Sequence, residues 1–167
     1  MNYRTPCLCM LVATALASAS AQTRTSMWGK CDPPKVDQSI SIPDQPGHLF
    51  TLLQATCTVT GQKGGLAVKT FVVSEQGVVI GNHVKDRAIT VDTLANGDKV
   101  FAKSQTTATL TNAGPQSATA TYQITGGTGE VKGIQGSGTC RMTDSDFSCS
   151  GVYTIPGGKA TTEPTVK

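Results

Sequence analysis

Stretches rich in Thr, Val and Ile follow one another along most of this sequence, with turn signals between them. Such residues favour strands, and no stretch keeps the 3.6-residue apolar period of a helix for long. Asn96-Gly97 is a strong hairpin signal. The predicted strands cover residues 48–60, 66–75, 78–84, 87–94, 99–111, 116–125, 139–143 and 147–155, with a break at Gln76-Gly77. The pattern predicts an all-β protein in which sequential strands pair.

A series of about eight strands must hide its edges, because an unpaired edge is a template for aggregation. It can do so by closing into a barrel or by packing as a sandwich. The segment QSATATYQIT (116–125) alternates small polar residues with Ala and Ile, which fits the wall of a barrel with a small or partly polar interior. We therefore predict an antiparallel up-and-down β-barrel over residues 48–155.

The ends of the chain differ from this pattern. Residues 1–21 resemble a signal peptide, because Arg4 precedes an apolar run that ends in small residues, with cleavage expected after Ala21 or, as second choice, Ala19. The run is shorter than the roughly 20 residues of a membrane-spanning helix. We expect a protein exported to the periplasm or secreted, with no membrane span after cleavage.

Two further segments are predicted to lie outside the barrel. Residues 22–47 contain Pro33, Pro34, Pro43 and Pro46, which forbid a regular helix or a central strand. This segment is expected to be an irregular N-terminal arm. Residues 156–167, PGGKATTEPTVK, are expected to form a disordered tail.

Four cysteines follow the predicted signal peptide: Cys31, Cys57, Cys140 and Cys149. An even number in an exported chain indicates two disulfides, and no C-x-x-C pair suggests zinc. Cys140 and Cys149 flank a polar turn, so a bridge between them is natural and leaves Cys31 to pair with Cys57. A Cys57–Cys140 bridge is the main alternative, if the first and last strands are neighbours.

The charge of the chain excludes one large class of partner. The net charge is +3, and loss of Arg4 with the signal peptide would leave 13 basic and 11 acidic residues. The basic residues form no run and are not interleaved with aromatics, which argues against a nucleic-acid partner. No cofactor motif is present, and neither His48 nor His83 has a second histidine at metal-binding spacing, so we predict no cofactor and no metal.

The stretch YQITGGTGEVKGIQGSGTC, residues 122–140, holds six glycines. It lacks the Lys-Ser/Thr ending of a Walker loop, and no helix follows it as a dinucleotide fingerprint requires. Turns and close backbone approaches explain the glycines better. The stretch is similar to the glycine motif of the allene oxide cyclase barrel-like superfamily, which includes the dirigent proteins. The segments at 28–31, 46–50, 54–60 and 92–101 also resemble a group of exported bacterial proteins in that superfamily.

The resemblance implies an eight-stranded antiparallel barrel whose lumen can hold a small apolar ligand. It also allows a homo-oligomer, since plant members often form dimers or trimers. Catalytic residues of the plant enzymes cannot be placed on this chain, so enzyme activity is not transferred.

Six residues are candidates for a ligand site. Tyr122, Phe71 and Phe101 lie on predicted strands, where an aromatic can stack on a ligand or simply fill the core. His83, Asp86 and Arg87 belong to HVKDR, which forms either a polar cluster at a barrel mouth, with Asp92 following, or a solvated connection. Further acids at the lumen edge could be Glu75 and Glu130.

Three functions are compatible with these features. The leading one is non-catalytic binding of a small hydrophobic or aromatic molecule in the lumen. The second is an enzyme of the cyclase or dirigent kind, which would steer a reactive intermediate. The third is a structural or interaction protein of the cell envelope, whose barrel is filled with side chains. A binder needs a cavity of at least roughly 300 Å³, and an enzyme also needs a buried ionisable group with a shifted pKa.

Overall fold

The computed structural model describes residues 22–111 and 114–157, which form one antiparallel sheet of nine strands. The predicted signal peptide and almost all of the predicted tail lie outside the described residues. In the described part of the chain, no helix is long and apolar enough to cross a membrane. The strands are β1 (Thr23–Cys31), β2 (Val36–Ser41), β3 (His48–Lys63), β4 (Val68–Ile80), β5 (His83–Leu94), β6 (Lys99–Thr111), β7 (Gly114–Gly127), β8 (Gln135–Thr143) and β9 (Asp146–Thr154).

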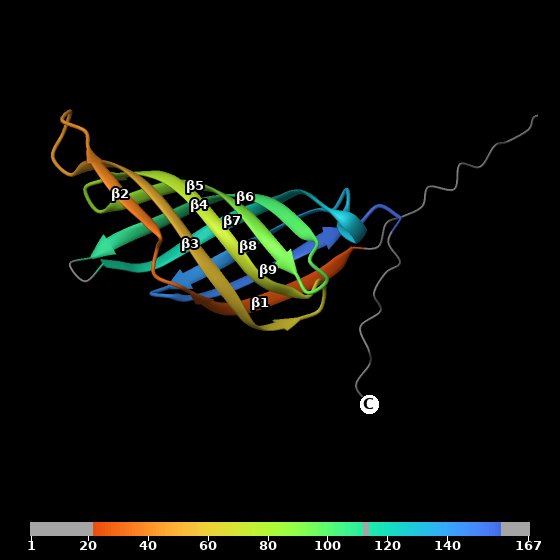
Figure 1. Ribbon diagram of the computed structural model, residues 1–167. Helices are drawn as coiled ribbons and strands as arrows, with labels where there is room; N and C mark the ends of the chain where they lie inside the picture. Colours follow the sequence, from red (N-terminus) through yellow and green to blue (C-terminus); the bar gives the residue numbers. More distant parts are fainter. Residues whose placement is uncertain (1–21, 112–113, 158–167) are drawn as a thin grey trace, which may run out of the picture.

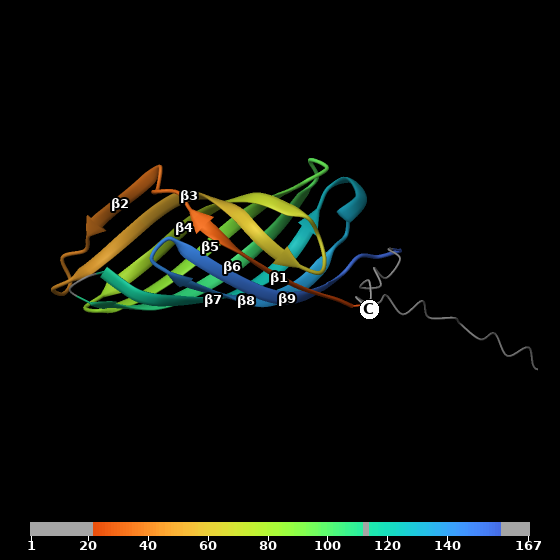
Figure 2. The same ribbon diagram turned by 90° about the horizontal axis from the view of Figure 1, so that it is seen from below.

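The sheet closes on itself (Figure 1). Its order is β1-β9-β8-β7-β6-β5-β4-β3-β2, and β1 also pairs with β3. The strands β1 and β3 to β9 therefore form a closed eight-stranded barrel, and β2 is an additional strand on β3. Figure 2 shows β2 at the end of the barrel away from the short helical turn η1 (Gly129–Val131). The predicted all-β antiparallel barrel is confirmed.

The N-terminal segment differs from the expectation. Within residues 22–47, β1 is a full strand of the barrel wall and β2 extends the sheet, so this segment is not an irregular arm. Pro33 and Pro34 lie between these two strands, and Pro43 and Pro46 lie in the connection from β2 to β3. The prolines restrict only these connections. Strand β1, TRTSMWGKC, ends at Cys31, before the first of these prolines.

A second difference concerns the predicted break at Gln76-Gly77. Strand β4 continues through both residues to Ile80, and the turn follows at Gly81 and Asn82. Gly77 is needed for space, because the Asp86 carboxyl group on the neighbouring strand occupies the place where a Cβ on Gly77 would lie.

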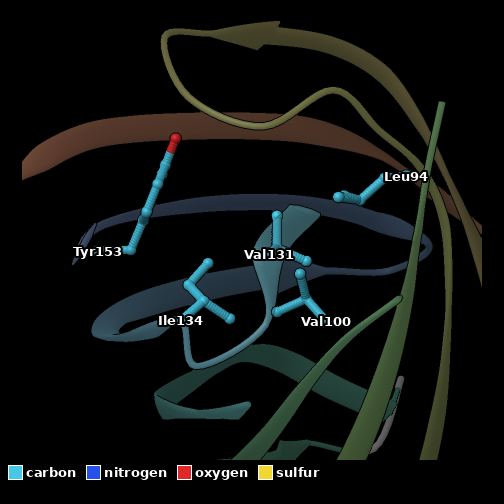
Figure 3. Packing of buried hydrophobic residues seen from close by; sticks show 5 residues of the cluster. All are labelled: Leu94, Val100, Val131, Ile134 and Tyr153. Atoms are coloured by element: carbon cyan, nitrogen blue, oxygen red, sulfur yellow. The ribbon is translucent and has the colours of Figure 1, made fainter. Parts of the chain in front are cut away.

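One end of the barrel is closed by apolar side chains. Val131 of η1 and Ile134, which follows it, are buried and point toward Val100 of β6 and Tyr153 of β9 (Figure 3). Leu94 of β5 completes this closing cluster. Val131 and Ile134 belong to the glycine-rich stretch, where Gly129 and Gly133 adopt positive φ angles of 53° and 78°. These glycines of the glycine-rich stretch thus serve to form turns.

Two disulfides tie neighbouring strands of the wall. Cys31 of β1 lies opposite Cys57 of β3, and Cys140 of β8 lies opposite Cys149 of β9. This is the preferred pairing from the sequence, and it is confirmed. The bridges pack with Phe147 in a second apolar cluster. Disulfides persist in oxidising compartments, so the pair is consistent with such an environment.

Candidate functional site

The barrel encloses a cavity of about 830 Å³. Residues of the closing cluster, Val100 and Tyr153, lie at its floor. Its lining also includes the connection after β1, residues 32–34, and the turn between β8 and β9, residues 144–146. The Cys31 backbone N–H donates to the Ser145 carbonyl oxygen at 2.8 Å, so these two segments lie side by side. We call this end of the cavity the mouth.

Unequal strand lengths shape the mouth. Strands β3 to β7 have 12 to 16 residues, whereas β1, β8 and β9 have nine each. The long strands therefore continue past the ends of the short ones, as Figure 1 shows. Thr51 and Leu53 of β3 and Ala108 of β6 line the cavity in this extended part. A ligand could reach the lumen from this side.

The wall is lined mainly by apolar and small side chains. Inward positions of the strands alternate with outward ones, as the pleat of a strand requires. Several inward positions hold alanine, which leaves the lumen unfilled: Ala55, Ala102, Ala108, Ala118 and Ala120. In a barrel of eight strands, larger side chains at these positions would fill the interior.

Four aromatic residues line the cavity: Phe71, Tyr122, Phe147 and Tyr153. Phe71 of β4 packs edge-on against Phe147, with ring centroids 5.0 Å apart. The Tyr122 ring extends from β7 across β8 and β9, where its hydroxyl group occupies the space next to Gly138 and Gly151. These two glycines face each other across the β8–β9 ladder. Because neither glycine has a side chain, the Tyr122 ring can lie against their backbone. Gly138 therefore contributes to the cavity wall and is also part of the glycine motif.

Two carboxyl groups meet inside the lumen. Glu75 of β4 and Asp86 of β5 lie on adjacent strands, with Glu75 opposite Ala88 and Asp86 opposite Gly77. Asp86 is only 9% exposed, and its Oδ1 atom is buried without a hydrogen-bond partner. Burial, followed by hydrogen bonding and repulsion from Asp86, raises the pKa of Glu75 to about 8. With its pKa raised in this way, the Glu75 carboxyl group is mostly protonated at neutral pH.

A third carboxyl group lies deeper. Asp92 of β5 lies opposite Phe71 on one side and Val100 on the other, near the floor. Burial raises its pKa to about 7, although a hydrogen bond with Thr90 acts in the opposite direction. Its side chain keeps some accessible surface because it faces the cavity. Burial and the nearby Asp92 charge also raise the pKa of Tyr122.

The charged residues are segregated between the two faces of the wall. Seven carboxyl groups line the cavity: Asp32, Asp37, Glu75, Asp86, Asp92, Asp144 and Asp146. No Lys, Arg or His lines it, within the residues that the structure describes. At the mouth, Asp146 is paired with Lys30 at 3.3 Å, and both side chains are exposed. The lumen is therefore acidic in a chain whose net charge is positive.

The six candidate residues divide between the lumen and the outer surface. Tyr122, Phe71 and Asp86 line the cavity. Phe101 is 36% exposed, and the side chains of His83 and Arg87 are exposed on β5. The structure thus brings three of the six together. Ligand binding by these residues stays a prediction.

The division of HVKDR follows from strand alternation. The segment is the start of β5, so Asp86 points inward while His83 and Arg87 point outward. The same alternation places Asp92 and Glu75 inside. Glu75 is two and four residues from the inward-facing Val73 and Phe71, and this spacing could have identified it. Glu130 instead lies at the closed end, where its backbone N–H donates to Asp98 Oδ2 at 3.0 Å.

The His, Cys, Asp and Glu side chains do not converge as metal ligands in the part of the chain that the structure describes. No group of three such side chains could hold a metal ion in the described part of the chain. His48, outside the lumen, makes a 2.6 Å contact from its Nδ1 atom to Asp44 Oδ1. This hydrogen bond lowers the pKa of Asp44. The histidine is thus engaged at the connection between β2 and β3.

Comparison with known proteins gives a likeness of fold alone. No protein-family model and no curated protein matches the sequence. The structure is similar to the crystal structure of a protein of unknown function, from the DUF3224 family, from Shewanella oneidensis MR-1. The TM-score is 0.52 at 13% sequence identity, over 79% of this chain and 97% of that one. The shared feature is the overall β fold, and no site or activity follows from it.

Proposed function

We propose that the protein binds a small hydrophobic or aromatic molecule in the barrel lumen. The observation that carries this proposal is the cavity of about 830 Å³. Ligand pockets commonly measure about 300–1,000 Å³ and are mainly apolar, with a few placed polar groups. The inward alanines keep the lumen open, and a barrel with a purely structural role would gain stability by filling it.

The compartment is part of the proposal. Two disulfides suit an oxidising environment, and the segment 1–21 has the features of a signal peptide. We therefore propose that the protein acts after export. The resemblance of the glycine-rich stretch to the allene oxide cyclase barrel-like superfamily supports the same proposal, since lumen binding is what that resemblance implies.

A second candidate is supported by the lumen carboxyl groups. Burial raises the pKa of both Glu75 and Asp92 into the neutral range, and each faces a space that a substrate could enter. Such groups can donate a proton to a bound molecule at neutral pH. An enzyme that steers a reactive intermediate would use this arrangement. Such an enzyme would convert the bound molecule chemically, and this conversion would be lost in Glu75→Gln or Asp92→Asn.

The binding proposal is tested with a neutral, apolar fluorescent probe, N-phenyl-1-naphthylamine, whose emission increases in apolar sites. We expect saturable binding to the purified protein with one site per chain. Ala120 lines the cavity and is 5% exposed, so Ala120→Phe should obstruct the lumen and weaken binding. The adjacent Thr121 is exposed, so Thr121→Phe is the matched control.

The outcomes separate the lumen from the outer surface. Loss of probe binding in Ala120→Phe, with Thr121→Phe unchanged and both variants folded by circular dichroism, supports the proposal. Equal binding by both variants would place the probe elsewhere. No saturable binding by the wild-type protein would count against a ligand-binding lumen.

A further inference from the structure

We propose that the lumen selects molecules that carry a positively charged, amine-type head on an apolar body, with the head at the Glu75–Asp86 pair. This inference rests on the proposed function and narrows its ligand class. Neutral and anionic molecules of the same shape would bind more weakly.

The first support is the sign of the charges around the cavity. The three inner carboxyl groups, Glu75, Asp86 and Asp92, have no salt bridge among the described residues. The basic residues of the described chain all lie outside the cavity lining, so no protein cation compensates them. A cleft with walls of low dielectric constant and one sign of charge concentrates ions of the opposite sign.

The second support is the state of the Asp86 side chain. It is buried between strands, and its Oδ1 atom has no hydrogen-bond partner. Buried polar atoms are normally satisfied, and an unpaired buried charge is costly. The repulsion between the two carboxyl groups can be relieved in two ways, by protonation of Glu75 or by a cation in the adjacent lumen. Gly77 on the neighbouring strand has no side chain, and this leaves the space that the Asp86 carboxyl group occupies.

The third support is the aromatic lining. Phe71 and Tyr122 line the same cavity as the carboxyl pair. Aromatic faces attract cations, and quaternary ammonium ions are recognised in this way in proteins. A lumen with carboxylates, aromatic rings and an otherwise apolar wall therefore matches an amphiphilic organic cation. A metal ion would need converging ligands, which the described residues do not provide.

The test is a charge series of small probes. Benzyltrimethylammonium keeps its positive charge at every pH, neopentylbenzene is its neutral isostere, and phenylacetate is an anion. Each probe competes with N-phenyl-1-naphthylamine for the purified protein at pH 8.5. We expect the cation to bind at least about tenfold more tightly than the neutral isostere. A factor of ten corresponds to about 1.4 kcal/mol, and a charge contact inside the lumen exceeds this value. The anion should bind most weakly.

Two variants test whether the preference for the cation arises at the Glu75–Asp86 pair. Glu75→Gln and Asp86→Asn should each reduce the preference for the cation to less than threefold and leave the neutral dye bound. Glu130→Gln makes the same chemical change outside the cavity and is the matched control. It should keep the full preference.

The pH dependence gives an independent readout. The other ionisable groups of the inner lumen are Asp92, on the same strand as Asp86, together with Tyr122 and Tyr153. The mouth adds Asp32, Asp37, Asp144 and Asp146. No basic group among the described lining residues opposes them. A bound cation favours the ionised form of Glu75, whose pKa is raised to about 8, so the affinity of the cation should rise between pH 6 and pH 9. The affinity of the neutral dye should change little.

Each outcome has one meaning. Tighter binding of the cation, lost in either variant of the pair, supports the inference. Equal or tighter binding of the neutral isostere, with the dye still bound, would overturn the inference while the proposed function stands. Failure of the dye itself to bind would remove the proposed function. The comparison of probes uses the wild-type protein and does not depend on a variant that folds.

Discussion

Replacing Glu75 with Gln should stabilise the protein increasingly as the pH rises. Glutamine has nearly the same shape and stays neutral, so it imitates the protonated acid. In the unfolded chain Glu75 ionises near its ordinary pKa of 4.5, whereas in the folded barrel its pKa is about 8. Between these values the folded state keeps a proton that the unfolded state has lost, so the free energy of unfolding falls as the pH rises.

The size of this effect has an upper limit. At about 1.4 kcal/mol per pH unit, the interval from 4.5 to about 8 corresponds to ~5 kcal/mol. Glu75 is only partly buried and faces a cavity open to solvent, so screening reduces this figure to about 1–2 kcal/mol. Asp92 is present in both proteins, so its contribution to the pH dependence largely cancels in the comparison.

The assay is urea denaturation of both proteins at pH 5 and pH 9, with the disulfides intact and the transition followed by circular dichroism. We expect nearly equal free energies of unfolding at pH 5 and an advantage of about 1–2 kcal/mol for Glu75→Gln at pH 9. A difference between the two proteins that is the same at both pH values would refute the reasoning, because it would show that Glu75 is not protonated in the folded barrel at neutral pH.

Two further changes test the packing of the wall. Gly77→Ala should destabilise the barrel by about 1–3 kcal/mol, because its Cβ would meet the Asp86 carboxyl group, whereas Gly126→Ala, with nothing within 4 Å, should change stability by less than about 0.5 kcal/mol. Equal effects in urea denaturation would contradict the steric account. Replacing Cys140 and Cys149 together with alanine opens a bridge across nine residues and should cost about 3 kcal/mol. A loss below about 1 kcal/mol, measured by the same method, would show that this cross-link constrains the unfolded chain very little.

Much of the fold could be predicted because the strands carry local signals. β-Branched residues, Asn96-Gly97 and the polar turn between Cys140 and Cys149 each mark an element by its own chemistry. The closure of the barrel needed a further strand, and β1 was hidden by the prolines that follow it. Prolines forbid a strand only at their own positions, so Pro33 and Pro34 do not prevent a strand that ends at Cys31.

The site was harder to predict, because the face of each residue depends on the exact strand register. HVKDR looks like one polar cluster in the sequence, but alternation sends His83 and Arg87 outward and Asp86 inward. Gly77 looks like the end of a strand, and its role becomes clear only beside the Asp86 carboxyl group on the next strand. The proximity of Glu75 and Asp86 arises from pairing between strands, which no local pattern contains.

The most direct test of a ligand-binding lumen is native mass spectrometry of the protein purified from its own source without harsh solvent, before and after incubation with N-phenyl-1-naphthylamine. We predict an added mass of one small molecule per chain, as isolated or after incubation, that disappears on denaturation and is absent from Ala120→Phe. The mass of the polypeptide alone under both conditions would contradict the account and indicate a barrel whose function lies on its outer surface.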